Sequence, residues 1–290
     1  MSAIAYITDS KLLELHRLNA NKEMNFWRIS TKTNFSDFGI GDLVFFLSKD
    51  KEHMKNKEKG IVGFGVLASI YTYAPRTMWN KFEEKNGYKS YELFKEAIIK
   101  ANKNHELPKK ISSFYLNNVT FFQSPIYLSE CKIEISKNVE SYIYLKPEET
   151  VITLLDYAKN AVDIWSSSEG ITDIIEDLQL EYAVKLAHND IGDIKLSEKD
   201  NKIAIKTMKK VQENNPVCHF IGNSKTDLCL VKEKDVLIVL YNNKKVDKRL
   251  LIGQSELYKI NIMKYYKNAY KLYFKTSNGD KELDNLLNRY

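Results

Sequence analysis

Gly60-Ile61-Val62-Gly63-Phe64-Gly65-Val66-Leu67 is the stretch that decides the fold of the first half of this chain. Apolar residues continue from it to Ile70, which favours a buried strand. Glycines inside a strand mark a bulge, a barrel corner or the close approach of another backbone. Two shorter strands are expected before it, over Phe26–Ser30 and Leu43–Leu47, and the polar segment 49–59 predicts an exposed hairpin loop. Several short strands around a small core predict a barrel-like sheet.

The remaining sequence predicts an α+β chain in three parts. Helical spacing over 88–103 and strand candidates at 119–122 and 141–145 complete a β-rich domain over 1–150. A helix over 148–165 and the linker Ser166-Ser167-Ser168-Glu169-Gly170 form a helical linker region, 151–170. The order helix, hairpin, helix, strand then predicts an α/β domain over 171–290. Its expected elements lie at 171–188, 202–212, 228–231, 236–241, 248–268 and 270–274.

Composition sets broad bounds on what the protein can be. Its 290 residues are 43% apolar and 28% charged, which is typical of a folded chain of about two domains. The net charge of +6 fits phosphate contacts, but an ordinary lysine-rich protein has a similar charge, so charge alone decides nothing. Three cysteines make no disulfide framework, and neither a signal peptide nor an 18-residue apolar run is recognised. These features predict a cytoplasmic protein.

Three blocks of the first half resemble EVE domains of the PUA-like superfamily. They are Asn25-Phe26-Trp27-Arg28-Ile29-Ser30-Thr31-Lys32, then Ile40-Gly41-Asp42-Leu43-Val44-Phe45-Phe46, then Gly60-Ile61-Val62-Gly63-Phe64-Gly65. Their order and spacing match, and the resemblance covers about residues 20–150. EVE domains are similar to YTH and SRA readers, so the resemblance implies a PUA/EVE-like β-barrel with helices that holds a flipped, modified base in an aromatic pocket.

A flipped base needs aromatic faces for stacking and a few polar groups to read its edge. The first half supplies many such residues, and the alternative is that its aromatic residues form the core. For Phe46 the core interpretation is preferred. Lys32 is a further polar candidate beside Trp27. The predicted base-binding residues are Trp27, Arg28, Ser30, Tyr71, Tyr73, Trp79, Tyr142 and Tyr144.

The second half is similar in layout to the PD-(D/E)xK nuclease fold. The segment around Asp227 is followed by the strand that ends at Asn242 and Lys244, and by a helix that carries Gln254 and Tyr258. The resemblance implies that Asp227 is a metal ligand and that Lys244 assists catalysis. It also implies that Glu181, on an upstream helix, supplies a second carboxylate. The expected cofactor is Mg²⁺, because this ion prefers hard oxygen ligands and polarises phosphate and water.

One departure leaves the function open between classes of protein. The acidic position of the second strand is Asn242, and a neutral amide binds Mg²⁺ more weakly than a carboxylate does. The main hypothesis is a modification-dependent restriction-type endonuclease for phage defence, in which Asp227, Asn242, Lys244 and Glu181 cut DNA. The alternative is a non-catalytic reader of modified DNA or RNA whose second domain binds a partner or forms a homodimer. A third possibility is a PUA-like RNA-binding protein linked to RNA modification.

Overall fold

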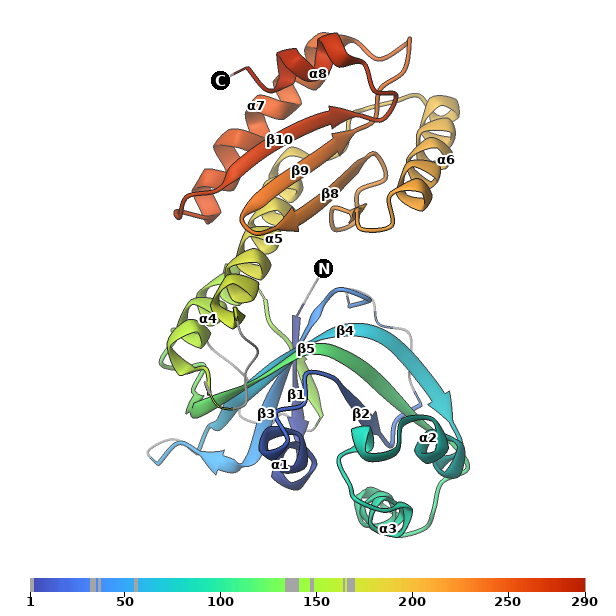
Figure 1. Cartoon of the computed structure of the whole chain (residues 1–290), viewed down its shortest axis with the longest axis vertical. Helices are drawn as coiled ribbons and strands as arrows, with labels where there is room; N and C mark the ends of the chain where they lie inside the picture. Colours follow the sequence, from blue (N-terminus) through green and yellow to red (C-terminus); the bar gives the residue numbers. More distant parts are fainter. Residues whose placement is uncertain are drawn as a thin grey trace. The chain divides into compact units, whose positions relative to one another are not determined.

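The protein, analysed as a computed structural model, consists of two compact units, residues 2–171 and residues 172–290. The structure describes residues 3–31, 35, 38–54, 57–133, 141–146, 149–163, 165 and 170–289. Lys32 and the linker residues 166–169 lie outside these ranges. The class is α+β, with one sheet in each unit (Figure 1).

The N-terminal unit is built on a mixed sheet of six strands in the order β2-β5-β4-β3-β1-β6. β1 and β3 run parallel, and the other neighbours are antiparallel. The strands are β1 (Ala3–Thr8), β2 (Met24–Arg28), β3 (Leu43–Glu52), β4 (Lys59–Tyr73), β5 (Ile111–Ile126) and β6 (Tyr142–Tyr144).

Glycines in β4 allow the two long strands β4 and β5 to approach each other closely. A Cβ at Gly63 would overlap the backbone carbonyl oxygen of Thr120 in β5. A Cβ at Gly60 would come within 2.5 Å of the Pro125 side chain. The register between the strands also shifts beside Gly63, between Ile61 and Gly63. The expected close approach of another backbone is therefore found at Gly63.

The sheet curls, but it does not close into the predicted β-barrel. The ring centroids of Tyr6 in β1 and Phe26 in β2 are 5.3 Å apart, although three strands separate β1 from β2 in the sheet. Within the described residues, however, β2 and β6 remain the edges, and no backbone pairing joins them. The prediction of a closed barrel was wrong. The two sides of the curled sheet meet through side-chain contact between β1 and β2, and no backbone hydrogen bonds between described residues close the sheet.

Helices connect several strands of this sheet and pack near its ends (Figure 1). α1 connects β1 to β2, and its Asp9 cap accepts a hydrogen bond from the Lys11 backbone N–H at 2.9 Å. α2 and α3 are inserted between β4 and β5, and Figure 1 shows them near the same ends of these strands. α4 packs against β5. The helices are α1 (Ser10–Leu18), α2 (Pro75–Phe82), η1 (Glu83–Asn86), α3 (Tyr91–Ala101) and α4 (Glu149–Ala161).

The C-terminal unit has a four-stranded mixed sheet in the order β10-β9-β8-β7. β8 and β9 form the predicted hairpin, and β10 runs parallel to β9. Its strands are β7 (His219–Phe220), β8 (Asp227–Lys232), β9 (Asp235–Leu240) and β10 (Lys271–Thr276). Its helices are α5 (Ile171–Ile191), α6 (Glu198–Asn214), α7 (Lys248–Tyr265) and α8 (Lys281–Leu287). Among the residues described, no helix has the length and apolar character needed to cross a membrane.

Candidate functional site

A cavity of about 880 Å³ opens in the N-terminal unit between β1, α1, β2 and α3. Aromatic side chains form part of its wall, namely Tyr6, Phe26, Trp27 and Tyr88. Ligand pockets for small molecules span about 300–1,000 Å³, so the cavity has room for a base with its sugar.

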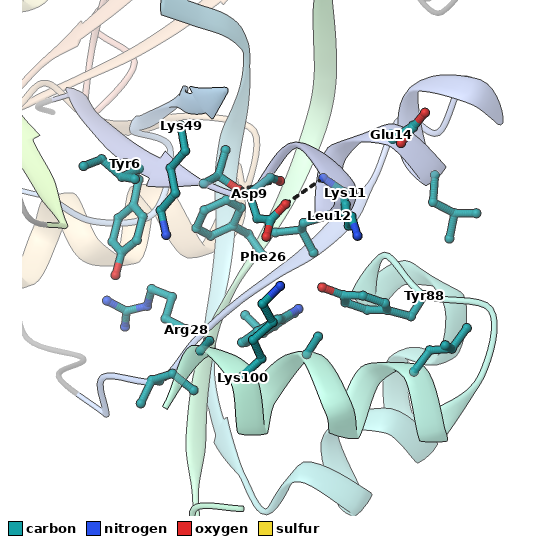
Figure 2. A pocket seen from close by; sticks show the side chains of 18 of the residues that line it. Tyr6, Asp9, Lys11, Leu12, Glu14, Phe26, Arg28, Lys49, Tyr88 and Lys100 are labelled. Carbon is teal, nitrogen blue, oxygen red and sulfur yellow. Dashed lines mark hydrogen bonds between the residues drawn. The ribbon is translucent and has the colours of Figure 1, made fainter. Parts of the chain in front are cut away.

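Four cationic side chains reach this cavity from four different elements. Lys11 comes from α1, Arg28 from β2, Lys49 from β3 and Lys100 from α3. Figure 2 shows the Lys49 and Lys100 ammonium groups pointing into the cavity. Three carboxylates also line it, namely Asp9, Glu14 and Glu96. Asp9 caps α1, so its charge is partly satisfied by a backbone N–H. The lining therefore carries four cationic and three anionic side chains beside its aromatic ones.

Arg28 is buried in the wall, where its guanidinium contacts an aromatic ring and a hydroxyl group. Its guanidinium carbon lies 4.0 Å from the ring centroid of Phe114, and its Nη2 donates to Ser112 Oγ at 2.7 Å. The Ser112 hydroxyl in turn donates to the Ser30 carbonyl oxygen. Burial lowers the pKa of Arg28, while the phenol of Tyr6 acts in the opposite direction. Because arginine stays protonated at any physiological pH, a fixed positive charge stands beside Tyr6.

The aromatic wall contains a buried donor with no partner. Trp27 packs against Phe94 and Tyr88, at ring-centroid distances of 5.7 and 6.3 Å. Among the described residues, nothing accepts a hydrogen bond from its indole Nε1–H, although that atom is buried. Burial, followed by the charge of Asp9, raises the pKa of Tyr88 to about 12, so its hydroxyl remains a donor at neutral pH. The Tyr88 hydroxyl, which belongs to a lining residue, suits a ligand with acceptor atoms.

The structure brings together some of the predicted base-binding residues but not others. Trp27, Arg28 and Ser30 line the cavity. Tyr142 stacks on Tyr6, a lining residue, with ring planes 8° apart and centroids 5.8 Å apart. The rings of Tyr142 and Tyr144 are 5.7 Å apart, and neither residue is among those that line the cavity.

The other three predicted aromatic residues do not line the cavity, although they pack against the same core cluster around α2 and α3 as Trp27 and Tyr88 do. Tyr71 and Tyr73 stack on each other at 5.8 Å, and Lys81 Nζ lies 4.2 Å from the centroid of Tyr71. Trp79 packs against Phe94. Sequence reasoning missed Tyr6, Lys11, Lys49, Tyr88 and Lys100. Of these, Tyr88 and Lys100 fall in the segment with helical spacing.

In the C-terminal unit, Asp227 is the centre of a buried polar cluster. It is 1% exposed at the start of β8, and its Oδ2 accepts hydrogen bonds from Gln254 Nε2 and Tyr258 Oη, both at 2.7 Å. The Tyr258 hydroxyl also lies 2.7 Å from His188 Nδ1. Thr226 Oγ1 lies 3.0 Å from Asp227 Oδ1 and 2.9 Å from Asp193 Oδ1. We call His188, Asp193, Thr226, Asp227, Gln254 and Tyr258 the Asp227 cluster.

The other predicted catalytic residues do not join this cluster. Glu181 lies 2.9 Å from His219 Nε2, which is also 3.4 Å from Cys229 Sγ. Burial lowers the pKa of His219, but its hydrogen bonds with Cys229 and Glu181 outweigh burial and raise it. The Asn242 amide donates to Asn278 Oδ1 at 3.1 Å. Lys244 lies in the turn that follows β9.

Of the residues expected to bind Mg²⁺, Asp227 does lie near a second carboxylate, but that carboxylate is Asp193 rather than Glu181, which pairs with His219. Leu240 is the cross-strand partner of Asp227, so the neighbouring strand places an apolar side chain opposite that carboxylate. Both oxygens of Asp227 already accept hydrogen bonds. Ligand atoms of His188, Asp193 and Asp227 do lie within 4.8 Å of one another, but Mg²⁺ prefers oxygen ligands over imidazole.

Comparison with known proteins adds a weak structural likeness. No family model and no curated protein matches the chain. The chain is similar to the ASCH protein of Zymomonas mobilis, at 14% identity over 53% of this chain and 94% of that one, with a TM-score of 0.36. A serine-to-alanine mutant of that protein gives 13% identity, 53% and 95% coverage, and a TM-score of 0.37. These neighbours support neither an EVE domain in particular nor a nuclease. Because their TM-scores are below 0.5, the fold and function of this chain are argued from its own residues.

Proposed function

We propose that this protein binds nucleic acid and captures a single base in the cavity of its N-terminal unit. The observation that carries the proposal is the convergence of aromatic faces and four cations from separate elements on one cavity of nucleotide size. Bases stack on aromatic side chains, and phosphates pair with lysine and arginine. The resemblance to EVE domains makes a modified base the first ligand to test.

Roles follow from the position of each group. Lys49 and Lys100, with flexible side chains that point into the cavity, would contact the phosphates on either side of the base (Figure 2). The Tyr88 hydroxyl would donate to acceptor atoms of the ligand. Arg28 would hold a fixed charge at the end of the cavity where Tyr6 lies.

Cleavage of DNA is not part of this proposal. The Asp227 carboxylate accepts hydrogen bonds from Gln254 and Tyr258, and its cross-strand partner is the apolar Leu240. Mg²⁺-dependent cleavage by Asp227, Asn242, Lys244 and Glu181 therefore stays a prediction. The non-catalytic reader of modified DNA or RNA is the function that the geometry favours.

Tryptophan fluorescence tests the capture of a base. Trp165 is 94% exposed, so the titration uses a Trp165→Phe background in which only Trp27 and Trp79 emit. Single-stranded oligonucleotides that carry one modified base, or its unmodified counterpart, are the probes. We expect quenching in this background that disappears with Trp27→Phe and persists with Trp79→Phe. The two tryptophans are matched, since both pack against Phe94.

Two lysine variants complete this test. Lys49→Gln and Lys100→Gln should each lower the slope of log affinity against log salt by about 0.7, the value for one phosphate contact on a single strand. Preference between the modified and unmodified probes should remain. Quenching that survives Trp27→Phe, together with unchanged salt slopes in both lysine variants, would exclude the cavity as the binding site.

A further inference from the structure

α6 presents a row of lysines on one face. Ala204 and Met208 are fully buried, so the opposite side of the helix faces outward. With 3.6 residues per turn, the lysines of this outer side fall within an arc of about 100° and span about 16 Å along the axis. We call Lys199, Lys202, Lys206, Lys209 and Lys210, all of them exposed, the lysine face of α6.

The acidic residues of the helix neutralise only part of this face. Glu198 lies 3.0 Å from Lys202, and Asp200 pairs with Lys245 of the turn after β9, also at 3.0 Å. Glu213 is exposed near the end of the helix. Within the ranges that the structure describes, no carboxylate forms an ion pair with the lysines of the C-terminal half, namely Lys206, Lys209 and Lys210.

In Figure 1, no other helix drawn for this unit lies beside α6 on the side away from β8. α6 packs on β8, and Figure 1 shows it on the side of the sheet away from α7 and α8. The exposed lysines cluster on the same side of the helix, while the opposite side is anchored in the core. The arrangement leaves a straight, positively charged ridge on the surface of the unit.

We propose that the lysine face of α6 binds the phosphodiester backbone of a nucleic acid. A duplex carries one negative charge per about 1.7 Å of axis with both strands counted, so a length of about 16 Å carries roughly ten phosphates, about twice the number of lysines on the face. This inference rests on the proposed function for the identity of the polymer, and it gives the second unit a role that needs no catalytic carboxylates. Because lysine contacts to phosphate carry no sequence information, α6 sets affinity and salt dependence, while the cavity sets which base is held.

The test removes three of the lysines from the full-length protein. Lys206→Gln, Lys209→Gln and Lys210→Gln are combined, since glutamine keeps a helix propensity close to that of lysine. The control combines Lys267→Gln, Lys275→Gln and Lys281→Gln, three exposed lysines outside α6, and removes the same charge. Binding of a 20-base-pair duplex and of the matching single strand is measured from 50 to 200 mM salt.

We expect the α6 variant to lose up to about 2.7 units of salt slope on the duplex and about 2.1 on the single strand. If the slopes differ by about 2.7 units, the ratio of wild-type affinity to variant affinity falls on the order of 40-fold between 50 and 200 mM salt. The control should keep the wild-type slope. Equal losses in both variants would overturn the inference by showing a diffuse charge effect, and the relative loss on duplex and single strand tells which form is held.

The outcomes separate this inference from the proposed function. A wild-type slope in the α6 variant, together with quenching that depends on Trp27, would leave the cavity as the binding site and remove α6 from the contact. A lower salt slope in the α6 variant, together with quenching that does not depend on Trp27, would support α6 as the contact and exclude the cavity as the binding site. No binding of either probe by the wild-type protein at 50 mM salt would overturn both.

Discussion

Asp227→Ala should destabilise the C-terminal unit by about 3 kcal/mol, because the structure shows Asp227 as an acceptor at the centre of a buried network. Three side-chain donors lie within 3.0 Å of its oxygens. Once the carboxylate is removed, the Tyr258 hydroxyl can still donate a hydrogen bond to His188 Nδ1, and the Thr226 hydroxyl can still donate one to Asp193 Oδ1. Gln254 Nε2 has no such alternative among the described contacts. A buried donor left unpaired costs about 1–3 kcal/mol, and the vacated volume adds to this.

Thermal unfolding followed by circular dichroism measures this loss. A cost of about 3 kcal/mol in a unit of this size lowers Tm by roughly 10 °C. Hydrogen exchange should assign the loss to peptides from β8 and α7. Asp190→Ala is the matched control, because Asp190 sits on the surface of α5 and pairs with Lys264 at 3.0 Å. Exposed ion pairs contribute about 0–1 kcal/mol, so the control should change Tm only slightly.

A nuclease would give the opposite result. If Asp227 were kept for metal binding, its removal would leave Tm unchanged or higher, because functional sites are commonly stabilised when their residues are replaced. The same variant would abolish Mg²⁺-dependent cleavage of modified DNA. That pair of results would refute the structural role assigned to Asp227 and restore the endonuclease hypothesis.

Three further predictions concern the N-terminal unit. Burial lowers the pKa of His16 to about 4, against 6.5 in the unfolded chain, so the unfolded state binds more protons between these values. Stability should therefore fall by up to about 3 kcal/mol as pH drops through this window, and urea unfolding at several pH values should show a shallower fall in His16→Gln. Gly63→Ala should prevent normal pairing of β4 with β5, seen as a lower Tm, whereas Gly39→Ala, where a Cβ meets no atom within 4 Å, should not. Arg28→Lys should weaken oligonucleotide binding at constant net charge, because lysine cannot reproduce the stacking on Phe114 together with the bond to Ser112; unchanged affinity would contradict a role for the planar group.

Much of the N-terminal sheet could be predicted because its strands are apolar and bounded by turns. The interval 60–70 became β4, with one residue added before it and three after it. β5 was recognised only at 119–122, because Ser112 and Ser113 interrupt the apolar pattern although both are buried. Arg28 and Met78 contact these two hydroxyls, so their burial depends on residues far away in the chain. Periodicity cannot reveal such a strand.

The candidate site was less predictable than the fold for a similar reason. Trp27, Arg28 and Ser30 were named from one block of sequence, but Lys49 and Lys100 reach the cavity from elements that only the folded sheet brings near. Aromatic content alone could not distinguish the residues that line the cavity from neighbouring ones, such as Trp79, that do not. In the C-terminal unit, the position of Asp227 at a strand start was predicted, whereas its pairing with Leu240 depends on the hairpin register.

The position of β1 in the sheet constrains the order in which this unit can form during synthesis. β1 pairs on one side with β3 and on the other with β6. One edge of β1 therefore stays unpaired until Tyr142–Tyr144 has been synthesised. A ribosome adds about 5–20 residues per second, so the interval between the end of β3 and the end of β6 lasts roughly 5–20 s. During that interval the nascent chain exposes an apolar strand edge able to pair with another chain. Slower translation before residue 142 would therefore raise the yield of aggregated chains, and faster completion of β6 would lower it.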